Sequence, residues 1–260
     1  MKRIILGAVL AIATLATQAI QAKDMTELRF GVDPTYAPFE SKSPSGQLVG
    51  FEIDLGNEIC RRLQMHCVWV ETGFDGIIPA LQGRKFDAIL SAMSITPKRE
   101  EQVAFSQPLF NTPSRLIAKD GSGLQPTVQS LRGKAVGVAQ GSTQEAYAKA
   151  NWATAGINVV SYANQEQVYP DLRSGRIDAT FTDALAGING FLKTSQGSGY
   201  GFAGQDVSDP KTLGKGAGIG FRKDDSALRQ KVDQAIDSML KDGTYKRIEE
   251  KYFDIDIHGS

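Results

Sequence analysis

The chain has 260 residues, which is long enough to bury a large core in one or two domains. Hydrophobic residues make up 41% of it and charged residues 22%, as in an ordinary soluble globular protein. Lysine plus arginine and aspartate plus glutamate balance at 29 each, so no basic field exists to attract a polyanion, and we expect no nucleic-acid partner.

The N-terminus has the pattern of a secretory signal peptide. The basic residues Lys2 and Arg3 are followed by an apolar run over 4–20 and then by the polar stretch 21–24 that contains Ala22. We expect residues 1–22 to be removed by cleavage after Ala22, with cleavage after Ala19 as the alternative. The apolar run is short and contains threonine and glutamine, which favours a cleaved signal over a membrane anchor. The mature chain is therefore expected to be exported and soluble.

The first third of the mature chain predicts strand–helix–strand–helix–strand. The strands are expected at 28–33, 68–71 and 86–90, and the helices at 51–63 and from 74 past Leu81. This alternation is typical of a parallel α/β sheet. Ligands of such sheets bind outside the carboxyl ends of the strands, where Asp33 and Ser91 lie.

The two cysteines of the chain, Cys60 and Cys67, fall between the first helix and the second strand. Export implies an oxidising compartment, which favours a short local disulfide. A metal site with His66 as third ligand is the alternative, although no fourth ligand is in sight. We expect no metal.

The stretch 91–99 after the third strand is unusual for a helix start. Thr96 suits the N-cap and Pro97 the first helical position, which places Arg99 in the first turn. A cation there opposes the helix dipole, and a broken local rule suggests function. With the hydroxyls of Ser91 and Ser94 nearby, the guanidinium could hold a small carboxylate bidentately. The alternative is a solvated surface arginine.

After residues 109–113 the α/β pattern begins again. Strands are expected at 135–138, 157–160 and 177–183, with helices from 143 to about 151, over 165–174 and over 184–192. A second α/β unit follows from this repetition. The glycine-rich stretch 214–221 lacks the ending of a phosphate-binding loop and is expected to be a strand that returns to the first unit, before helices at 226–240 and 244–252.

The residues favour binding over catalysis. Neither His66 nor His258 has the context of a nucleophile–base pair, so we expect no catalytic residues, no cofactor and no enzymatic activity. Backbone donors at 141–143 precede a helix and suit an anion, and Asp183 at a strand end suits an ammonium group.

Acids and aromatic rings near the same strand ends suit a cation. Asp33 and Glu52 lie close in sequence to several aromatic residues, which attract cations. These aromatic residues are Tyr36, Phe39, Phe51 and Phe74. Core packing is the favoured alternative for Phe39 and Phe51, and Glu52 could equally be a helix N-terminal acid. The combination describes an amino acid with a cationic side chain.

Several separated motifs resemble one family. The segments 33–40, 50–55, 94–99, 140–144 and 251–254 are similar to the lysine/arginine/ornithine- and histidine-binding periplasmic proteins of bacterial ABC importers, the family 3 solute-binding proteins. The resemblance implies an α/β, two-lobed type II periplasmic-binding-protein fold with a hinge between the lobes. Lobe 1 would comprise 23–111 and 214–260, and lobe 2 would comprise 112–213. It also implies a periplasmic, monomeric protein that binds a cationic amino acid and contacts a membrane permease.

The resemblance also implies roles for single residues. The ligand carboxylate would go to Arg99 and to N–H groups around Ser94, Ser142 and Thr143, and the amine to Asp183 and Ser94. The side chain would lie between Tyr36 and Phe74, with its cationic end facing Asp33, Ser91 and Glu52. Gln144 would line the site, and Cys60 and Cys67 would form a disulfide.

Three departures bear on the ligand. Ala92 stands where the family usually has serine, Glu52 where it has aspartate, and Ala139 where it has leucine. Arginine, lysine, ornithine, histidine or an opine therefore remain candidates, and Phe74 ranks arginine first. A cyclohexadienyl-type dehydratase with Asp33 and Glu52 as catalytic acids and a sensory ligand-binding protein are the alternative functions.

Overall fold

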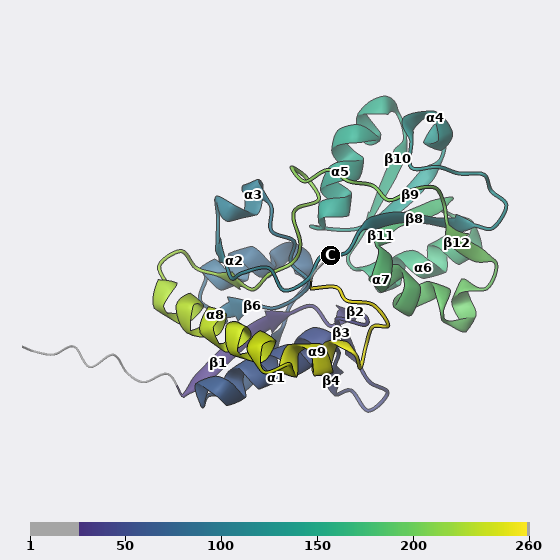
Figure 1. Cartoon of the computed structure of the whole chain (residues 1–260). Coiled ribbons are helices and arrows are strands. Elements are labelled where there is room, and N and C mark those ends of the chain that lie inside the picture. The colour runs from purple at the N-terminus through teal and green to yellow at the C-terminus, as the bar shows by residue number, and fades with distance from the viewer. Residues whose placement is uncertain (1–25, 259–260) are drawn as a thin grey trace, which may run out of the picture.

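Two five-stranded sheets, one in each half of the molecule, organise the chain (Figure 1). The computed structural model describes residues 26–258, so the expected signal peptide at 1–22 lies outside the described residues. Each sheet carries helices on its faces, which gives the two-lobed α/β architecture expected from the sequence. None of the helices within 26–258 has the length and apolar character needed to span a bilayer.

The first sheet is mixed, with strand order β5-β1-β6-β13-β7. β1 pairs in parallel with β5 and β6, and β13 pairs antiparallel with β6 and β7. The strands are β1 (Glu27–Val32), β5 (His66–Glu71), β6 (Ala88–Ile89), β7 (Ala104–Phe105) and β13 (Gly220–Phe221). A small antiparallel sheet, β2 (Thr35–Tyr36), β3 (Glu40–Lys42) and β4 (Leu48–Val49), lies beside it.

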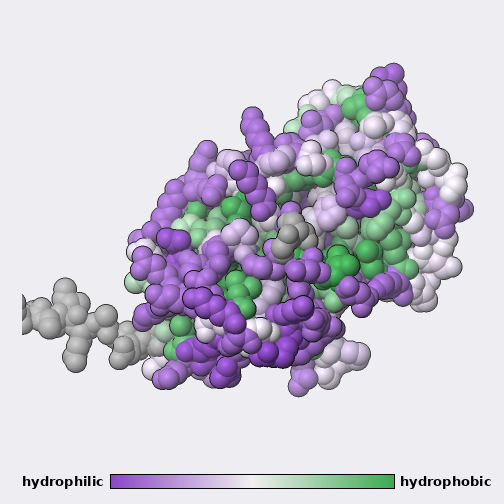
Figure 2. Space-filling view, viewed as in Figure 1, coloured by the Kyte–Doolittle hydropathy of each residue, from purple (hydrophilic) through white to green (hydrophobic). Residues whose placement is uncertain are grey.

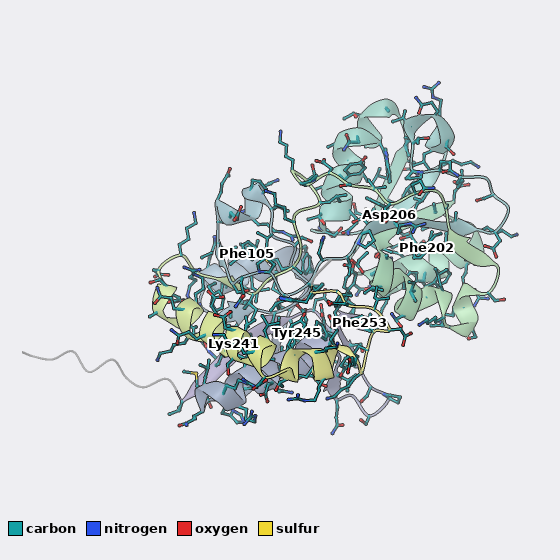
Figure 3. All side chains as sticks on the ribbon, viewed as in Figure 1. Phe105, Phe202, Asp206, Lys241, Tyr245 and Phe253 are labelled. Atoms are coloured by element: carbon teal, nitrogen blue, oxygen red, sulfur yellow. A yellow bond between two sulfur atoms is a disulfide. The ribbon has the colours of Figure 1, made fainter. Side chains whose placement is uncertain are left out.

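Helices from both ends of the chain cover the first sheet. The early ones are α1 (Phe51–Leu63), the 3₁₀ turn η1 (Phe74–Gly76), α2 (Ile77–Gln82) and α3 (Pro97–Glu100), and the late ones are α8 (Ser226–Lys241) and α9 (Thr244–Glu249). Phe51 of α1 packs edge-on against Phe253, with ring centroids 5.2 Å apart. Tyr245 and Phe253 lie on the C-terminal segment of this lobe (Figure 3). Phe39 and Phe51 both belong to this core, as expected.

The second sheet has the order β10-β9-β11-β8-β12. β9 is parallel to β10 and β11, and β8 is antiparallel to β11 and β12. Its strands are β8 (Ser114–Lys119), β9 (Ala135–Ala139), β10 (Asn158–Tyr162), β11 (Ala179–Asp183) and β12 (Tyr200–Phe202). Its helices are α4 (Val128–Leu131), α5 (Thr143–Asn151), η2 (Ala153–Ala155), α6 (Gln165–Ser174), α7 (Ala184–Gly187), the π-helical η3 (Ile188–Leu192) and η4 (Ser195–Gly197).

The chain passes between the sheets twice, between β7 and β8 and again between β12 and β13. The glycine-rich stretch does return to the first sheet, but only Gly220–Phe221 forms a strand there. Ala217 instead makes single bridges to Ser94 and Phe110. A strand over all of 214–221 was therefore too long a prediction. The lobe boundaries at 111/112 and 213/214 fall in these connections and stay a prediction.

Cys60 and Cys67 form a disulfide that joins the end of α1 to β5. Their Cα atoms are 5.6 Å apart, and Gln64 ends the helix in the left-handed conformation between them. The disulfide alternative is confirmed. It lies near the start of β1, because Cys67 pairs with Leu28, whereas Asp33 follows the other end of that strand.

Candidate functional site

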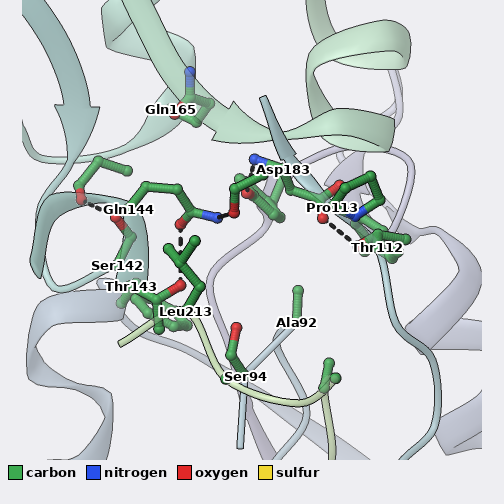
Figure 4. A pocket seen from close by; sticks show the side chains of 18 of the residues that line it. Ala92, Ser94, Thr112, Pro113, Ser142, Thr143, Gln144, Gln165, Asp183 and Leu213 are labelled. Carbon is green, nitrogen blue, oxygen red and sulfur yellow. Dashed lines mark hydrogen bonds between the residues drawn. The ribbon is translucent and has the colours of Figure 1, made fainter. Parts of the chain in front are cut away.

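A cavity of about 560 Å³ lies between the two lobes at the carboxyl ends of their parallel strands. Side chains from both lobes project into it, among them Asp183 and Gln144 from the second and Ser94 from the first (Figure 4). Hydrophilic residues cover much of the visible face of the molecule, with hydrophobic patches between them (Figure 2). The cavity wall includes Asp33, Tyr36, Phe74, Ser91, Ser94, Arg99, Ser142, Thr143, Gln144 and Asp183. All of these were predicted binding residues.

Arg99 supplies a buried cation. The Thr96 hydroxyl accepts a hydrogen bond from the Arg99 backbone N–H (3.2 Å) and caps α3, as predicted. The guanidinium donates Nη1 to the Ser94 carbonyl (2.9 Å) and Nη2 to the Gly141 carbonyl (3.1 Å), and it lies over the Phe74 ring. It is 9% exposed, so it is not the solvated surface arginine of the alternative.

No acid balances this charge. Among the ion pairs of residues 26–258, none involves Arg99. Burial lowers the pKa of the Arg99 guanidinium to about 10. A buried charge held only by neutral carbonyls is costly unless an ion joins it. The geometry therefore suits an incoming anion.

The second lobe brings the start of α5 to the same end of the cavity. Ser142 is its N-cap, because the Ser142 hydroxyl accepts from the Glu145 N–H (3.0 Å). Gln144 is held by a hydrogen bond from its Nε2 to the Ser114 hydroxyl (2.9 Å). The first N–H groups of a helix have no intrahelical acceptor and favour anions. Thr143 and Gln144 thus present such groups opposite Arg99.

Asp183 supplies a buried acid from the second lobe. It ends β11 and caps α7, with Oδ1 accepting from the N–H groups of Leu185 (2.8 Å) and Ala186 (3.1 Å). Its Oδ2 accepts from the Thr112 hydroxyl. Burial raises the pKa of Asp183 to about 6. No lysine or arginine within 26–258 pairs with it, so it suits an ammonium group.

The remaining acids line the first-lobe wall. Asp33 follows β1, and its carboxylate accepts from the Thr35 hydroxyl (2.7 Å) and from the Phe74 N–H (3.0 Å). Burial raises the pKa of Asp33. The Ser91 hydroxyl accepts from the Asp33 N–H (3.0 Å) and donates to Glu40 Oε1 (3.1 Å). Glu40 lines the cavity and was missed, although it ends the motif 33–40.

Glu52 does not line the cavity, contrary to the expectation that it faces the ligand. It is fully buried in the first turn of α1, and its Oε2 accepts from the Ala92 N–H (2.5 Å). Ala92 lies on the wall. The first turn of α1 packs behind that wall, which is why Glu40 takes the place expected for Glu52.

The connections between the lobes add wall residues that sequence reasoning missed. Thr112 lies in the first crossing and contacts Asp183, and Ser114 begins β8 and contacts Gln144. Residues from the second crossing close the cavity from its other side: Asp206, Val207, Ser208, Asp209, Pro210, Leu213, Gly214, Lys215, Gly216 and Ala217. The polar side chain of Thr112 is the sequence signal that could have indicated its contact with Asp183.

Comparison with known proteins gives the same family as the motifs. Residues 28–255 match the bacterial extracellular solute-binding proteins, family 3. The chain belongs to this family. The solute-binding protein is 48% identical to the lysine/arginine/ornithine-binding periplasmic protein of Escherichia coli K12 and 47% identical to the histidine-binding periplasmic protein of that strain. Each of these alignments covers 100% of both chains.

A solved structure agrees. An ancestral arginine-binding protein bound to arginine superimposes with a TM-score of 0.82 at 37% identity, covering 88% of this chain and 99% of that one. The relatives are binding proteins and not enzymes, which confirms the prediction that the solute-binding protein is not an enzyme. The fold prediction is confirmed as well.

The lobes of the solute-binding protein touch across the cavity. The bond from Arg99 to the Gly141 carbonyl joins the first lobe to the second. The Tyr36 hydroxyl accepts from the Asp183 N–H (3.4 Å) and lies 3.4 Å from the Thr182 hydroxyl. These hydrogen bonds join the two lobes across the site.

Proposed function

We propose that the protein captures a cationic amino acid in the periplasm and delivers it to the permease of an ABC importer. The observation that carries this proposal is that Arg99 and Asp183 are buried in the same cavity and that, within residues 26–258, neither forms an ion pair. A zwitterion satisfies both groups at once: its carboxylate pairs with Arg99 and its ammonium group with Asp183.

The rest of the cavity favours a cationic side chain. Asp33 and Glu40 place two more carboxyl groups on the wall, near the rings of Tyr36 and Phe74. Acids attract the cation, and aromatic faces add about 0.5–2 kcal/mol. We rank arginine first, because its planar guanidinium stacks on an aromatic ring better than an ammonium group does. Lysine, ornithine, histidine and opines follow. The names of the relatives support this ligand class.

Closure of the lobes links binding to transport. A ligand held by Arg99 on one lobe and Asp183 on the other favours the closed form over the open one. A membrane permease can then distinguish loaded from empty protein. We propose further that residues 1–22 direct export and that the mature protein works as a monomer.

A ligand screen tests the proposal. The mature protein would be heated with each amino acid and with opines, and hits would be measured by calorimetry. A ligand at 100 times its dissociation constant stabilises the fold by about 2.7 kcal/mol, which gives a clear rise in Tm. We expect basic amino acids to raise Tm and leucine and glutamate to leave it unchanged. A folded sample that responds to no basic amino acid would refute the proposal.

Delivery needs its own test. Spheroplasts that lack their own basic amino-acid binding proteins would be supplied with purified mature protein and radiolabelled arginine. Uptake that depends on both the added protein and ATP supports the permease as partner. If the protein binds arginine but restores uptake with none of the matched permeases tested, the proposal that it delivers its ligand to a permease would be wrong.

A further inference from the structure

Two glutamates lie next to each other beneath the first-lobe wall. Glu40 of β3 is 1% exposed and Glu52 of α1 is 0% exposed. Each carboxyl group has one oxygen with a conventional donor: Glu40 Oε1 accepts from Ser91, and Glu52 Oε2 accepts from the Ala92 N–H. The other two oxygens, Glu40 Oε2 and Glu52 Oε1, have no such donor among the described residues.

Backbone contacts hold the two glutamates together. The N–H of Phe51 donates to the Pro38 carbonyl and the N–H of Glu52 to the Phe39 carbonyl, both at 2.9 Å. Gly50 allows this approach, because a Cβ built there would lie 2.3 Å from the Phe39 oxygen and the backbone φ is +138°. The start of α1 is thus pressed against the segment that leads into Glu40.

Glu40 Oε2 and Glu52 Oε1 are thus two buried carboxyl oxygens without a donor, on residues that the backbone bonds place side by side. A carboxylate has no hydrogen to donate, so two ionised groups would leave both of these oxygens unsatisfied, whereas one shared proton lets one carboxyl group donate to the other. Burial raises the pKa of Glu52 to about 7, and burial together with the Glu52 carboxyl raises that of Glu40 well above its usual range. Two adjacent ionised carboxylates in a buried site are strongly disfavoured.

The surroundings add no positive charge. The Asp33 carboxyl group, at the end of β1, raises the pKa of Glu40 further, and Glu52 in turn helps to raise the pKa of Tyr245 in α9. Within residues 26–258, no ion pair of lysine, arginine or histidine reaches Glu40 or Glu52. Arg99 and Lys215 line the same cavity but form no ion pair with either glutamate, so a bound ligand would be the cation that pairs with this wall.

We propose that Glu40 and Glu52 share one proton in the ligand-free protein and release it to solvent when a cationic side chain binds against Glu40. The carboxyl O–H bond breaks, its electron pair stays on the oxygen, and the proton passes to the buffer base. The pair goes from one negative charge to two, and the ligand contributes one positive charge. This inference rests on the proposed function, because it requires a cationic ligand in the cavity. Through this proton release, the glutamate pair would favour ligands with a cationic side chain over ligands with a neutral one.

The direction of the pH effect follows from linkage. A nearby cation favours the ionised pair, so the affinity for arginine should rise with pH through the neutral range, by at most about tenfold per pH unit for one released proton. Asp183 also titrates near this range, since burial raises its pKa to about 6. L-Citrulline controls for it, because citrulline keeps the α-ammonium group and replaces the guanidinium with a neutral urea.

The shared proton itself can be measured without any ligand. Infrared difference spectra of the intact mature protein at about pH 7 should show the carbonyl stretch of a protonated carboxyl group. Glu52→Gln should remove that band. Glu58→Gln is the matched control: Glu58 lies on the same helix but pairs with Arg61 and Arg62, which lower its pKa, so the band should remain. Absence of the band in the wild type would overturn the proposal.

Proton release on binding is then measured by calorimetry with L-arginine and L-citrulline in phosphate and in Tris, whose ionisation enthalpies differ. We expect arginine to release up to about one more proton than citrulline at pH 7, and Glu52→Gln to abolish that excess. If citrulline does not bind, the test is the pH dependence of arginine affinity in the wild type and in Glu52→Gln. Equal slopes of affinity against pH in the two proteins would overturn the proposal. An excess that survives in Glu52→Gln also overturns it.

The two levels of inference fail differently. If no basic amino acid binds, the proposed function is wrong, while the infrared band still reports on the shared proton. If arginine binds and releases no more protons than citrulline, the proposed function stands and the proton linkage is wrong.

Discussion

Two buried arginines with opposite surroundings offer a sharp test of the site. Arg99 has only carbonyl partners, whereas Arg222 pairs with Asp225 at 2.6 Å and with Asp87 at 3.5 Å. Their exposed fractions are nearly equal, at 9% and 8%. The substitutions Arg99→Met and Arg222→Met therefore remove the same group from equally buried positions, one without acid partners and one with them.

The expected effects are opposite. Removing Arg99 leaves the ligand carboxylate without its cation, which costs about 3–5 kcal/mol of binding free energy and weakens the Kd for arginine by about 10²–10⁴-fold. The unfolding free energy of the empty protein should stay the same or rise, because a buried charge without an acid partner does not stabilise the fold. Removing Arg222 leaves Asp225 without its cation, whereas Asp87 keeps its pair with Arg29, and should cost about 3 kcal/mol of stability.

The assay is calorimetry with L-arginine together with urea unfolding of the empty protein, for the wild type and both variants. Arg222→Met should bind arginine with a Kd close to that of the wild type at a temperature where it is folded. Arg99→Lys keeps the charge but loses the bidentate geometry, and should fall between Arg99→Met and the wild type. A Kd within tenfold of the wild type in Arg99→Met would refute the assignment of Arg99 to the ligand carboxylate.

Three further predictions concern other parts of the cleft and the fold. Asp183→Asn keeps a capping oxygen but loses the charge that pairs with the ammonium group, so arginine affinity should fall by about 10–10³-fold with little change in Tm; unchanged affinity by calorimetry would remove Asp183 from the site. In Gly141→Ala, the new methyl group would lie 2.8 Å from the η1 backbone of the other lobe and block closure. Gly156→Ala is the control, because Gly156 has a similar positive φ but open space around it. Arginine affinity should drop at least about tenfold in Gly141→Ala only, and equal losses in both variants would contradict the closure argument. Replacing Cys60 and Cys67 with serine removes a disulfide that closes a short loop and stabilises the fold by about 2–3 kcal/mol, so Tm should fall by several degrees. Arginine affinity should stay within about twofold of the wild type, because the disulfide lies at the opposite end of β1 from the cavity.

Local features of the chain could be predicted well because their causes are local. The helix expected at 165–174 is α6 (Gln165–Ser174), capped by the Asn164 side chain. Thr96 caps α3 and Pro97 occupies its first position, as their residue types indicate. Capping and apolar periodicity act within one or two turns of a helix, so a short stretch of sequence is enough to specify them.

Contacts between distant segments could not be predicted in the same way. The sequence placed Glu52 against the ligand, but the structure brings Glu40 to the cavity wall and leaves Glu52 behind Ala92. That choice depends on how the segment before β3 packs across the start of α1, through the bond from Glu52 N–H to the Phe39 carbonyl. Residue type alone made both acids plausible.

The sequence by itself determined the alternation of strands and helices, the cap before Arg99 and the family. Only the tertiary structure decided that Arg99 meets the Gly141 carbonyl of the other lobe, that Thr112 contacts Asp183, and that two glutamates share one buried site. The physical reason is range: a cap or a helical stripe is set by neighbours in the chain, whereas a cleft between lobes is set by two chain crossings whose geometry no single segment contains.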